Sequence, residues 1–444
     1  MAAGAPISGP EAELTHSRVV RMALPVVLSN ATVPLLGAVD TGVVGQLGEA
    51  APIGAVGVGA VTLATVYWIF GFLRMGTAGL TAQAVGANDR AETSALMTRV
   101  LMIAGSAGLA LIALQGAIFW GAFQIAPASA EVEMLARDYM AIRIFSAPAA
   151  IAIYGIGGWL VAHERTGALF WMQLLSNGLN IVLSIWFVLG LGWGVEGVAL
   201  ATLISEWAGL AFGLWLTREA FAHRDWRDWP KVFDRQRLVR MAAVNTDIMI
   251  RSVILMAGFT SFIYLAANYG DDVLAANQVL LQFVYVSSHA MDGFTFSAQA
   301  LVGQAVGARV PAQLRLAVKL SFTWAFASCA VLTVIFAVWG GAIIDLMTSA
   351  EEVRAAARSY LPWMVVTPLL GCAAWMFDGV FVGATRTRDM RNMMIVSALI
   401  YVICLAVLLP RFENHGLWVS MIVFFVARGV SLGLRYPALE RTAG

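Results

Sequence analysis

The sequence predicts an all-α polytopic membrane protein with twelve transmembrane helices in two six-helix lobes, related by a pseudo-two-fold axis along the membrane normal. Three observations lead to this prediction. Of the 444 residues, 60% are hydrophobic and 12% are charged, whereas a soluble domain has about 25% charged residues. Apolar stretches long enough to span a bilayer recur along the whole chain. Short motifs of the first half also return in the second half.

Twelve apolar stretches of about 20 residues or more can each cross the roughly 30 Å hydrocarbon layer of a bilayer. Five prolines lie inside them, and each removes a backbone donor and favours a bend. Such a bend can mark a moving helix or a static kink; the prolines are Pro25, Pro34, Pro148, Pro362 and Pro368. The predicted spans are 15–44, 53–81, 95–123, 135–162, 167–190, 195–220, 237–269, 273–303, 314–346, 353–384, 392–410 and 415–436.

The distribution of Lys and Arg predicts the orientation of these spans. Twenty of the 28 basic residues fall in the termini or in loops on the same side, seven of them between Arg218 and Arg240. Because basic loops stay in the cytoplasm, both termini are expected there, in a multi-pass protein of the plasma (bacterial inner) membrane. The N-terminus has no apolar stretch before Arg18, so no cleaved signal peptide is expected.

These boundaries predict the domain organisation. The basic segment "HRDWRDWPKVFDRQR" (223–237) is interpreted as a hinge between two halves rather than as a nucleic-acid patch. Three cysteines, all in apolar stretches, are interpreted as core residues: Cys329, Cys372 and Cys404. The predicted parts are an N-terminal cytoplasmic tail (1–14), an N-lobe of helices 1–6 (15–220), a cytoplasmic linker (221–236), a C-lobe of helices 7–12 (237–436) and a C-terminal tail (437–444).

The two halves repeat with an offset of 221 residues. "AQAVGA" (82–87) recurs as "GQAVGA" (303–308), and "GWLVAHERT" (158–166) aligns with "GVFVGATRT" (379–387) at the same offset. Six spans separate equivalent points, so both halves face the same way. Transporters built in this manner hold their substrate between the halves and alternate access by rocking one half against the other.

Asp40 breaks this repeat. It is the one ionisable residue in the apolar stretch "VPLLGAVDTGVVGQLG" (33–48), and its counterpart 221 residues later is Ser261. A carboxylate at that depth costs roughly 2.5–3.5 kcal/mol on insertion scales. A residue needed only for the shared fold should occur in both halves, so Asp40 is predicted to bind a proton or another cation. The alternative is an acid permanently paired with a buried cation from another helix.

Several motifs resemble the DinF-type branch of the MATE (multidrug and toxic compound extrusion) family. They are "ALPVVLSNATVPLLGAVDTGVVGQLG" (23–48), "FGFLRMGTAGLTAQAVGA" (70–87), "NTDIMIRS" (245–252) and "LAANQVLLQFVYVSSHAMDGFTFSAQALVGQAVGA" (274–308). The resemblance runs along essentially the whole chain. It implies two six-helix lobes around a central cavity, and export of organic, often cationic compounds against inward H⁺ or Na⁺. It also implies that protonation of Asp40 is coupled to bending of the first helix at Pro25.

The same resemblance extends the N-lobe site to the fifth and sixth helices. It points to Asn180 and Ser184, four residues apart on one helical face, and to Thr202, with Glu206 one turn further on as a secondary candidate. Some relatives carry a second aspartate where this chain has Ser184. Because a hard cation such as Na⁺ prefers several oxygen ligands and more negative charge, H⁺ is the favoured coupling ion and Na⁺ the alternative. No other cofactor and no metal are expected.

The second half carries other intramembrane charges that are secondary candidates. Asp247 and Arg251 are spaced to form an ion pair within one helix, and Asp292 could face Arg251. This group is interpreted as structural, with a cation site as the alternative. Asp378 is more isolated in the sequence and is the second candidate for cation binding. Arg74 and Arg428 are expected to gate or snorkel, and His289 to be a core histidine with a proton relay as the alternative.

Other function classes are less well supported by the sequence. A lipid or saccharide-lipid flippase of related architecture would need several cavity arginines to bind phosphate, but only Arg74, Arg143, Arg251 and Arg428 lie within spans. No enzyme is expected, because metal-ligand spacings, a Walker loop and a Ser/His/Asp arrangement are absent from the sequence. The expected partners are small organic substrates, cationic or amphipathic, and the lipid bilayer. No nucleic acid partner is expected, and the chain is expected to be a monomer.

Overall fold

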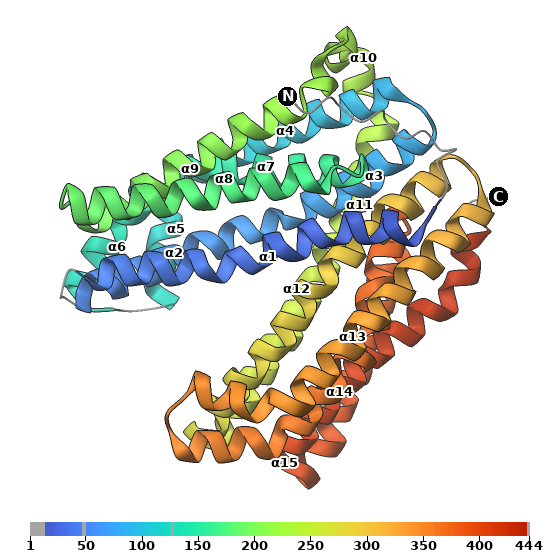
Figure 1. Ribbon diagram of the computed structural model, residues 1–444. Coiled ribbons are helices and arrows are strands. Elements are labelled where there is room, and N and C mark those ends of the chain that lie inside the picture. The colour runs from blue at the N-terminus through green and yellow to red at the C-terminus, as the bar shows by residue number, and fades with distance from the viewer. Residues whose placement is uncertain (1–13, 47–49, 126–127, 442–444) are drawn as a thin grey trace. The chain divides into compact units, whose positions relative to one another are not determined.

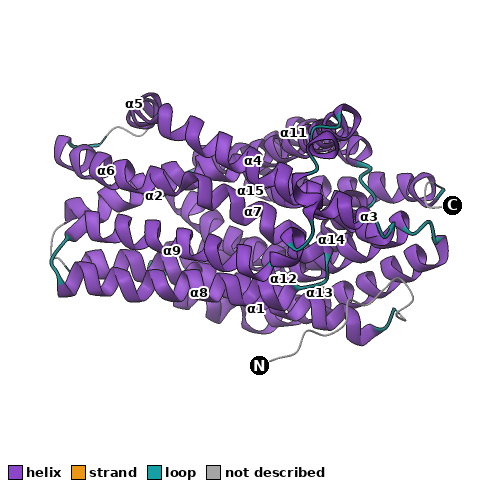
Figure 2. Ribbon diagram, turned by 90° about the horizontal axis from the view of Figure 1, so that it is seen from above, coloured by secondary structure: helices purple, strands orange, loops and turns teal. Residues whose placement is uncertain are grey.

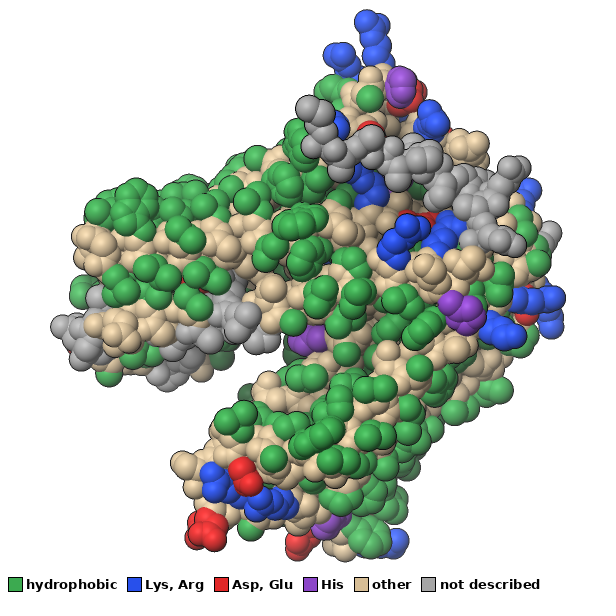
Figure 3. Space-filling model, in the orientation of Figure 1, with side chains coloured by type: hydrophobic (Ala, Val, Ile, Leu, Met, Phe, Trp, Pro, Cys, Tyr) green, Lys and Arg blue, Asp and Glu red, His purple; other side chains and the backbone are tan. Residues whose placement is uncertain are grey.

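The computed structural model describes residues 14–46, 50–125 and 128–441 (Figure 1). Within these ranges the chain is helical, with short connecting loops and no strand (Figure 2). Of the two predicted tails, residues 1–13 and 442–444 lie outside the described part. On the face drawn in Figure 3, hydrophobic side chains cover the lengths of the helices and charged ones gather near their ends. Exposed apolar side chains such as Trp120 and Leu434 are what a lipid-facing surface requires.

All six predicted spans of the first half are helical, and three of them are divided between two consecutive α-helices. The second is interrupted at Ile69–Gly71, the third at Leu114 and the fourth at Ile144–Ser146. The last interruption precedes Pro148, whose ring is tolerated in the first turn of a helix. The helices are α1 (His16–Gly45), α2 (Ala50–Trp68), α3 (Phe72–Gly86), α4 (Arg90–Ala113), α5 (Gln115–Ile125), α6 (Ala130–Arg143), α7 (Ala147–Ala162), α8 (Thr166–Ile185) and α9 (Gly194–Leu216).

The six spans of the second half are helical as well. The last two predicted spans share one long element, α15, which is interrupted at Glu413 (φ 49°, ψ −130°) between the two predicted ranges. Nine helical stretches of the described chain are long and apolar enough to cross a membrane, with α15 counted once. The prediction of an all-helical membrane fold is therefore confirmed. The helices are α10 (Trp229–Val232), α11 (Arg235–Ala266), α12 (Asp271–Gly307), α13 (Pro311–Met347), α14 (Glu351–Gly383) and α15 (Thr387–Glu440).

The backbone repeats with the offset found in the sequence. Helix α4 begins at residue 90 and α13 at 311; α8 begins at 166 and α15 at 387. Left-handed residues that end the preceding helices recur at the same offset, where a positive φ terminates the helical hydrogen bonding. They are Asn88 (φ 59°) with Arg309 (φ 57°), and Glu164 (φ 58°) with Thr385 (φ 51°). The internal repeat is thus present in backbone conformation as well as in sequence.

The chain divides into two compact units. The N-unit comprises Leu28–Thr81 and Asp89–Leu238; the C-unit comprises the described residues up to Val27, Ala82–Asn88, and Val239 onward. In the N-unit α4 packs on α7, α8 on α9, and α6 on both α2 and α9. In the C-unit α14 packs on α12, α13 and α15. The lobe boundaries read from the sequence stay a prediction.

The repeated glycine motifs pack against each other inside the C-unit. A Cβ on Gly86 would collide with the carbonyl oxygen of Gln304, and a Cβ on Gly307 would collide with that of Gln83. Since Gln83 and Gly86 correspond to Gln304 and Gly307 in the repeat, the contact is reciprocal. A reciprocal contact of equivalent residues is what a two-fold axis produces. The motifs are therefore glycine-containing because two backbones approach closely there.

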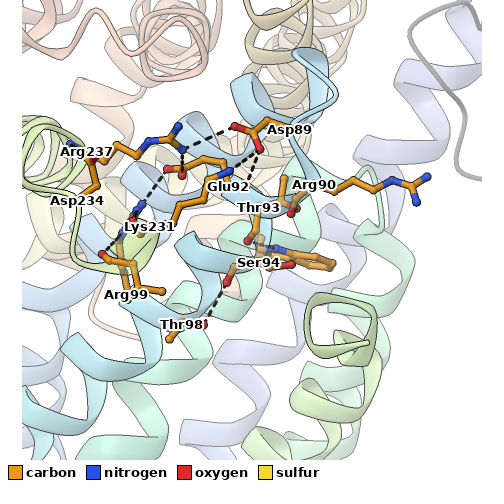
Figure 4. Close-up of polar contacts among 12 residues, drawn as sticks. Asp89, Arg90, Glu92, Thr93, Ser94, Thr98, Arg99, Lys231, Asp234 and Arg237 are labelled. Carbon is orange, nitrogen blue, oxygen red and sulfur yellow. Dashed lines mark hydrogen bonds and ion pairs between the residues drawn. The ribbon is translucent and has the colours of Figure 1, made fainter. Parts of the chain in front are cut away.

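The linker between the halves is held by ionic contacts within the N-unit (Figure 4). Arg99 on α4 is buried and donates from Nε to the carbonyl oxygen of Val232 (2.8 Å) and from Nη2 to that of Lys231 (2.6 Å). Glu92 accepts hydrogen bonds from both Arg99 and Arg237. The linker that was interpreted as a hinge is thus fixed to α4 at α10.

Asp89 completes this contact from the N-cap of α4. Its carboxylate accepts from the backbone N–H of Glu92 (3.0 Å) and from Lys231 Nζ (3.0 Å). Partial burial opposes ionisation, but these hydrogen bonds and the charges of Lys231 and Arg237 lower the pKa of Asp89 below its usual 3.8. A lowered carboxyl pKa stabilises the folded state above the unfolded pKa, and the contribution is lost as pH falls through the folded value. The contact should therefore persist to about pH 4.

We expect Arg99→Met to release α10 from α4 without unfolding the helices. The substitution keeps the apolar stem but removes the side-chain hydrogen bonds to the carbonyl oxygens of Lys231 and Val232 and one of the two donors to Glu92. Hydrogen exchange of the backbone amides of residues 229–237 should become about tenfold faster or more, while exchange in α8 and α9 stays unchanged. Arg90→Met, at an exposed position of the same helix, is the matched control. Unchanged linker exchange in Arg99→Met would show that Arg99 does not hold the linker.

Candidate functional site

A polar pocket of about 310 Å³ lies inside the N-unit among α1, α2, α6, α8 and α9. Its wall includes side chains that the sequence places far apart. Helical spacing helps to bring them together, because residues four apart share a face, as Tyr139 and Arg143 do on α6 and Thr202 and Glu206 do on α9. The polar side chains of the lining include Asp40 from α1, Tyr139 and Arg143 from α6, Asn180 from α8, and Thr202 and Glu206 from α9.

Asp40 is bonded to one of the residues predicted to accompany it. Ser184 donates from Oγ to Asp40 Oδ1 at 3.1 Å, and Ser184 itself is fully buried. The carboxylate therefore has a neutral hydroxyl as its direct hydrogen-bond partner. Arg143 acts on Asp40 through its charge, as an electrostatic attraction across the pocket.

Asn180 and Thr202 link the fifth and sixth predicted spans. Asn180 Nδ2 donates to Thr202 Oγ1 at 2.9 Å, and Thr202 donates on to the carbonyl oxygen of Val198 at 3.1 Å. Asn180 Oδ1 is buried and has no hydrogen-bond partner among the described residues. The four predicted residues Asp40, Asn180, Ser184 and Thr202 thus gather at one place, and their role in binding a proton or cation stays a prediction.

Arg143 is the pocket residue that the sequence reasoning missed. Its Nη2 lies 3.6 Å from Glu206 Oε1, and its Nη1 donates to the Tyr139 hydroxyl at 3.2 Å. Glu206, a secondary candidate in the sequence, therefore has a buried cation as its neighbour. The signal that could have revealed Arg143 was its position inside a span, where an ionisable residue is costly unless it is paired.

Pro25 lies inside α1, and the helix continues through it from His16 to Gly45. The division between the C-unit and the N-unit falls within this same helix, between Val27 and Leu28. Proline removes the hydrogen bond to the carbonyl four residues earlier, so the helical ladder of α1 lacks one bond at Pro25. The expected bending of α1 at Pro25 remains a prediction.

The C-unit holds a second buried ionic cluster, and its partners differ from those expected. Asp378 accepts hydrogen bonds at Oδ2 from both Arg251 and Arg428, the latter at 2.7 Å. Asp378 is therefore not isolated, and Arg428 does not snorkel: its side chain is 1% exposed. The sequence could not reveal these pairs because they join α11, α14 and α15 over 50 to 127 residues.

Asp247 also has a partner other than the expected one. Its carboxylate accepts from Arg391 Nη1 at 2.6 Å and from Thr387 Oγ1 at 3.1 Å. The expected pair within α11 is thus replaced by separate pairs, Asp247 with α15 and Arg251 with α14. Asp292 and His289 on α12 each have an interaction partner as well. The structure gives all these secondary candidates partners within the protein.

Comparisons with known proteins place these features in a family. The MatE family model matches twice, over residues 25–186 and 248–408, so its pattern occurs once in each half. The chain is 38% identical to "DNA damage-inducible protein F" of Escherichia coli K12 over 93% of this chain and 90% of that protein. It is 26% identical to a "Probable multidrug resistance protein NorM" of Xanthomonas campestris over 99% of both chains.

Solved structures share the fold at low sequence identity. A MATE protein crystallised in a bent conformation superposes with a TM-score of 0.86 at 20% identity, covering 96% of both chains. The Vibrio cholerae MATE transporter VcmN in its bent form gives a TM-score of 0.84 at 19% identity, covering 96% of this chain and 97% of that one. The likeness therefore extends over nearly the whole length of the chain.

Proposed function

Since the chain belongs to the MATE family of multi-pass membrane transporters, we propose that it exports small organic compounds from the cell in exchange for protons that enter. The cargo is cationic or amphipathic, and access alternates between the two sides of the membrane. The protein works as a monomer in the bacterial inner membrane with both termini in the cytoplasm. The excess of Lys and Arg in the loops beside the termini supports this orientation, and the bacterial relatives support the location.

The observation that carries this proposal is Asp40 in the N-unit pocket. An ionised carboxylate only accepts hydrogen bonds, whereas a protonated one also donates. Loading and unloading a proton at Asp40 therefore changes its bonds to Ser184 and its attraction to Arg143. Because Asp40 sits on α1, such a change acts directly on the helix that carries Pro25. A proton that changes the hydrogen bonds of a helix in this way can be coupled to a change in the side of the membrane to which the substrate site opens.

Sodium is the second candidate for the coupling ion. Asn180 Oδ1 is a buried oxygen without a partner among the described residues, and Asp40 and Thr202 could supply further oxygens. Na⁺ prefers several oxygen ligands with more than one negative charge. This chain has Ser184 in place of a second acid, and the Arg143 cation lies in the same pocket. The pocket is therefore better suited to bind a proton than Na⁺.

Efflux from proteoliposomes tests the proposal when ΔpH and a Na⁺ gradient are imposed separately. For ethidium, a monovalent cation, one-for-one exchange with H⁺ moves no net charge, so each pH unit should drive about tenfold accumulation. A potential clamped with valinomycin should have little effect, although 100 mV would contribute about 2.3 kcal/mol for each net charge moved. Accumulation driven by Na⁺ at zero ΔpH would contradict proton coupling, and no gradient-driven movement of ethidium or of neutral dyes would contradict export.

A further inference from the structure

We infer that Arg143 limits the N-unit pocket to one exchangeable proton by serving as the fixed counter-charge of Glu206, which leaves Asp40 as the carboxyl that loads and unloads. This inference rests on the proposed function and adds the number of protons and the residue that sets it. Arg143 has no counterpart among the residues that the family resemblance supplied.

The pocket lining contains three side chains that can carry a charge: Asp40, Glu206 and Arg143. When all three are ionised, they leave one net negative charge. A net charge inside a membrane protein is costly, so the pocket accepts one monovalent cation, and one proton satisfies it.

Arg143 contacts one of the two carboxylates directly. Glu206 is the carboxylate directly beside the guanidinium, with 3.6 Å between Arg143 Nη2 and Glu206 Oε1. Asp40 has the Ser184 hydroxyl as its direct partner and experiences Arg143 only through space. An opposite charge close by favours the ionised form of a carboxyl more than a distant one does. Arg143 therefore favours the ionised form of Glu206 more than that of Asp40, and the proton exchanges at Asp40.

Two tyrosine hydroxyls hold Arg143 in place. Its Nη1 donates to the Tyr139 hydroxyl, and its own carbonyl oxygen accepts from the Tyr67 hydroxyl at 3.2 Å. The other titratable groups that face the cluster are phenols: Tyr67 on α2, Tyr139 on α6 and Tyr154 on α7. Phenols are neutral at cellular pH, so none of them alters the count of charges, and the Tyr139 hydroxyl positions the guanidinium.

Variants that remove one or both of the charges of Arg143 and Glu206 test this inference directly. Glu206→Gln leaves Asp40 as the sole partner of Arg143, so Asp40 stays ionised and ΔpH-driven ethidium efflux should fall about tenfold or more. Removing the cation as well, in Arg143→Gln/Glu206→Gln, restores one net negative charge, and efflux should return. Arg143→Gln alone leaves two carboxyls without a fixed cation. Its efflux should become sensitive to a valinomycin-clamped potential, because two protons then exchange for one monovalent cation.

Proton titration of the purified variants gives a second readout that needs no substrate. Between pH 5 and pH 9, the wild type should release about one proton more than Asp40→Asn. Glu206→Gln should match Asp40→Asn, the Arg143→Gln/Glu206→Gln double variant should match the wild type, and Arg143→Gln should release about two. Only variants whose melting temperature equals that of the wild type are compared. The number of protons that the wild type releases relative to Asp40→Asn can be measured even if the other variants do not fold.

The outcomes separate this inference from the proposed function. If the wild type shows no ΔpH-driven efflux, the proposed function fails. If Asp40→Asn retains ΔpH-driven efflux, proton-coupled export stands, but Asp40 is not the coupling residue and this inference is overturned. If Asp40→Asn is inactive but the double variant is as inactive as Glu206→Gln, proton coupling at Asp40 stands and the role of Arg143 is overturned. A release of two protons by the wild type relative to Asp40→Asn would overturn it as well.

Discussion

Replacing Asp40 with Asn is expected to reduce ΔpH-driven efflux to the background of empty liposomes while leaving the protein folded. The amide keeps the shape of the side chain and can still accept the hydrogen bond from Ser184 (3.1 Å in the wild type). It cannot gain or lose a proton, however. The charged side chains that remain in the pocket are Arg143 and Glu206, whose opposite charges cancel. Efflux of ethidium at an imposed ΔpH measures the loss, and thermal unfolding in detergent measures the fold.

Asp138→Asn provides the matched control for this variant. Asp138 is an exposed acid on α6, the helix that also carries Arg143, so its removal changes the same helix by the same chemistry outside the pocket. Efflux of this control should equal that of the wild type. Wild-type rates in Asp40→Asn at the same ΔpH would rule out Asp40 as the coupling residue.

Replacing Asp378 with Asn is expected to reduce stability far more than it alters ion coupling. Asp378 is 4% exposed and is the carboxylate that both Arg251 and Arg428 contact. Its removal leaves two buried guanidinium groups without their counter-charge. Loss of one partner from a buried ion pair costs about 3–5 kcal/mol, so the melting temperature should fall by several degrees.

The double variant Asp378→Asn/Arg428→Gln shows whether the stability lost in Asp378→Asn comes from the missing counter-charge or from a change in side-chain packing. It removes one of the two unpaired cations and should therefore recover part of the stability lost in Asp378→Asn. Both variants should keep their dependence on ΔpH when efflux is corrected for the amount of folded protein. If Asp378→Asn instead removed ion coupling at unchanged stability while Asp40→Asn transported normally, the coupling site would lie in the C-unit.

The sequence by itself determined the elements and the repeat. Apolar length is a local property, so each of the twelve predicted spans could be located from composition, and each is helical. The offset of 221 residues is also present in the sequence motifs. It recurs in the residues at which helices begin and in the residues with left-handed backbone conformation. The grouping of Asp40 with Asn180, Ser184 and Thr202 came from a family resemblance, and the structure brings these residues together.

Only the tertiary structure decided which charges are partners. Spacing within a helix predicted a pair of Asp247 with Arg251, but the structure pairs Asp247 with Arg391 and Arg251 with Asp378. A sequence shows which side chains share one helical face, whereas the choice of partner depends on how that face packs against other helices. A buried charge is stabilised by the nearest opposite charge in space. For the same reason the sequence could not show that Arg143, one of four arginines within spans, lies beside Glu206 in the pocket that contains Asp40.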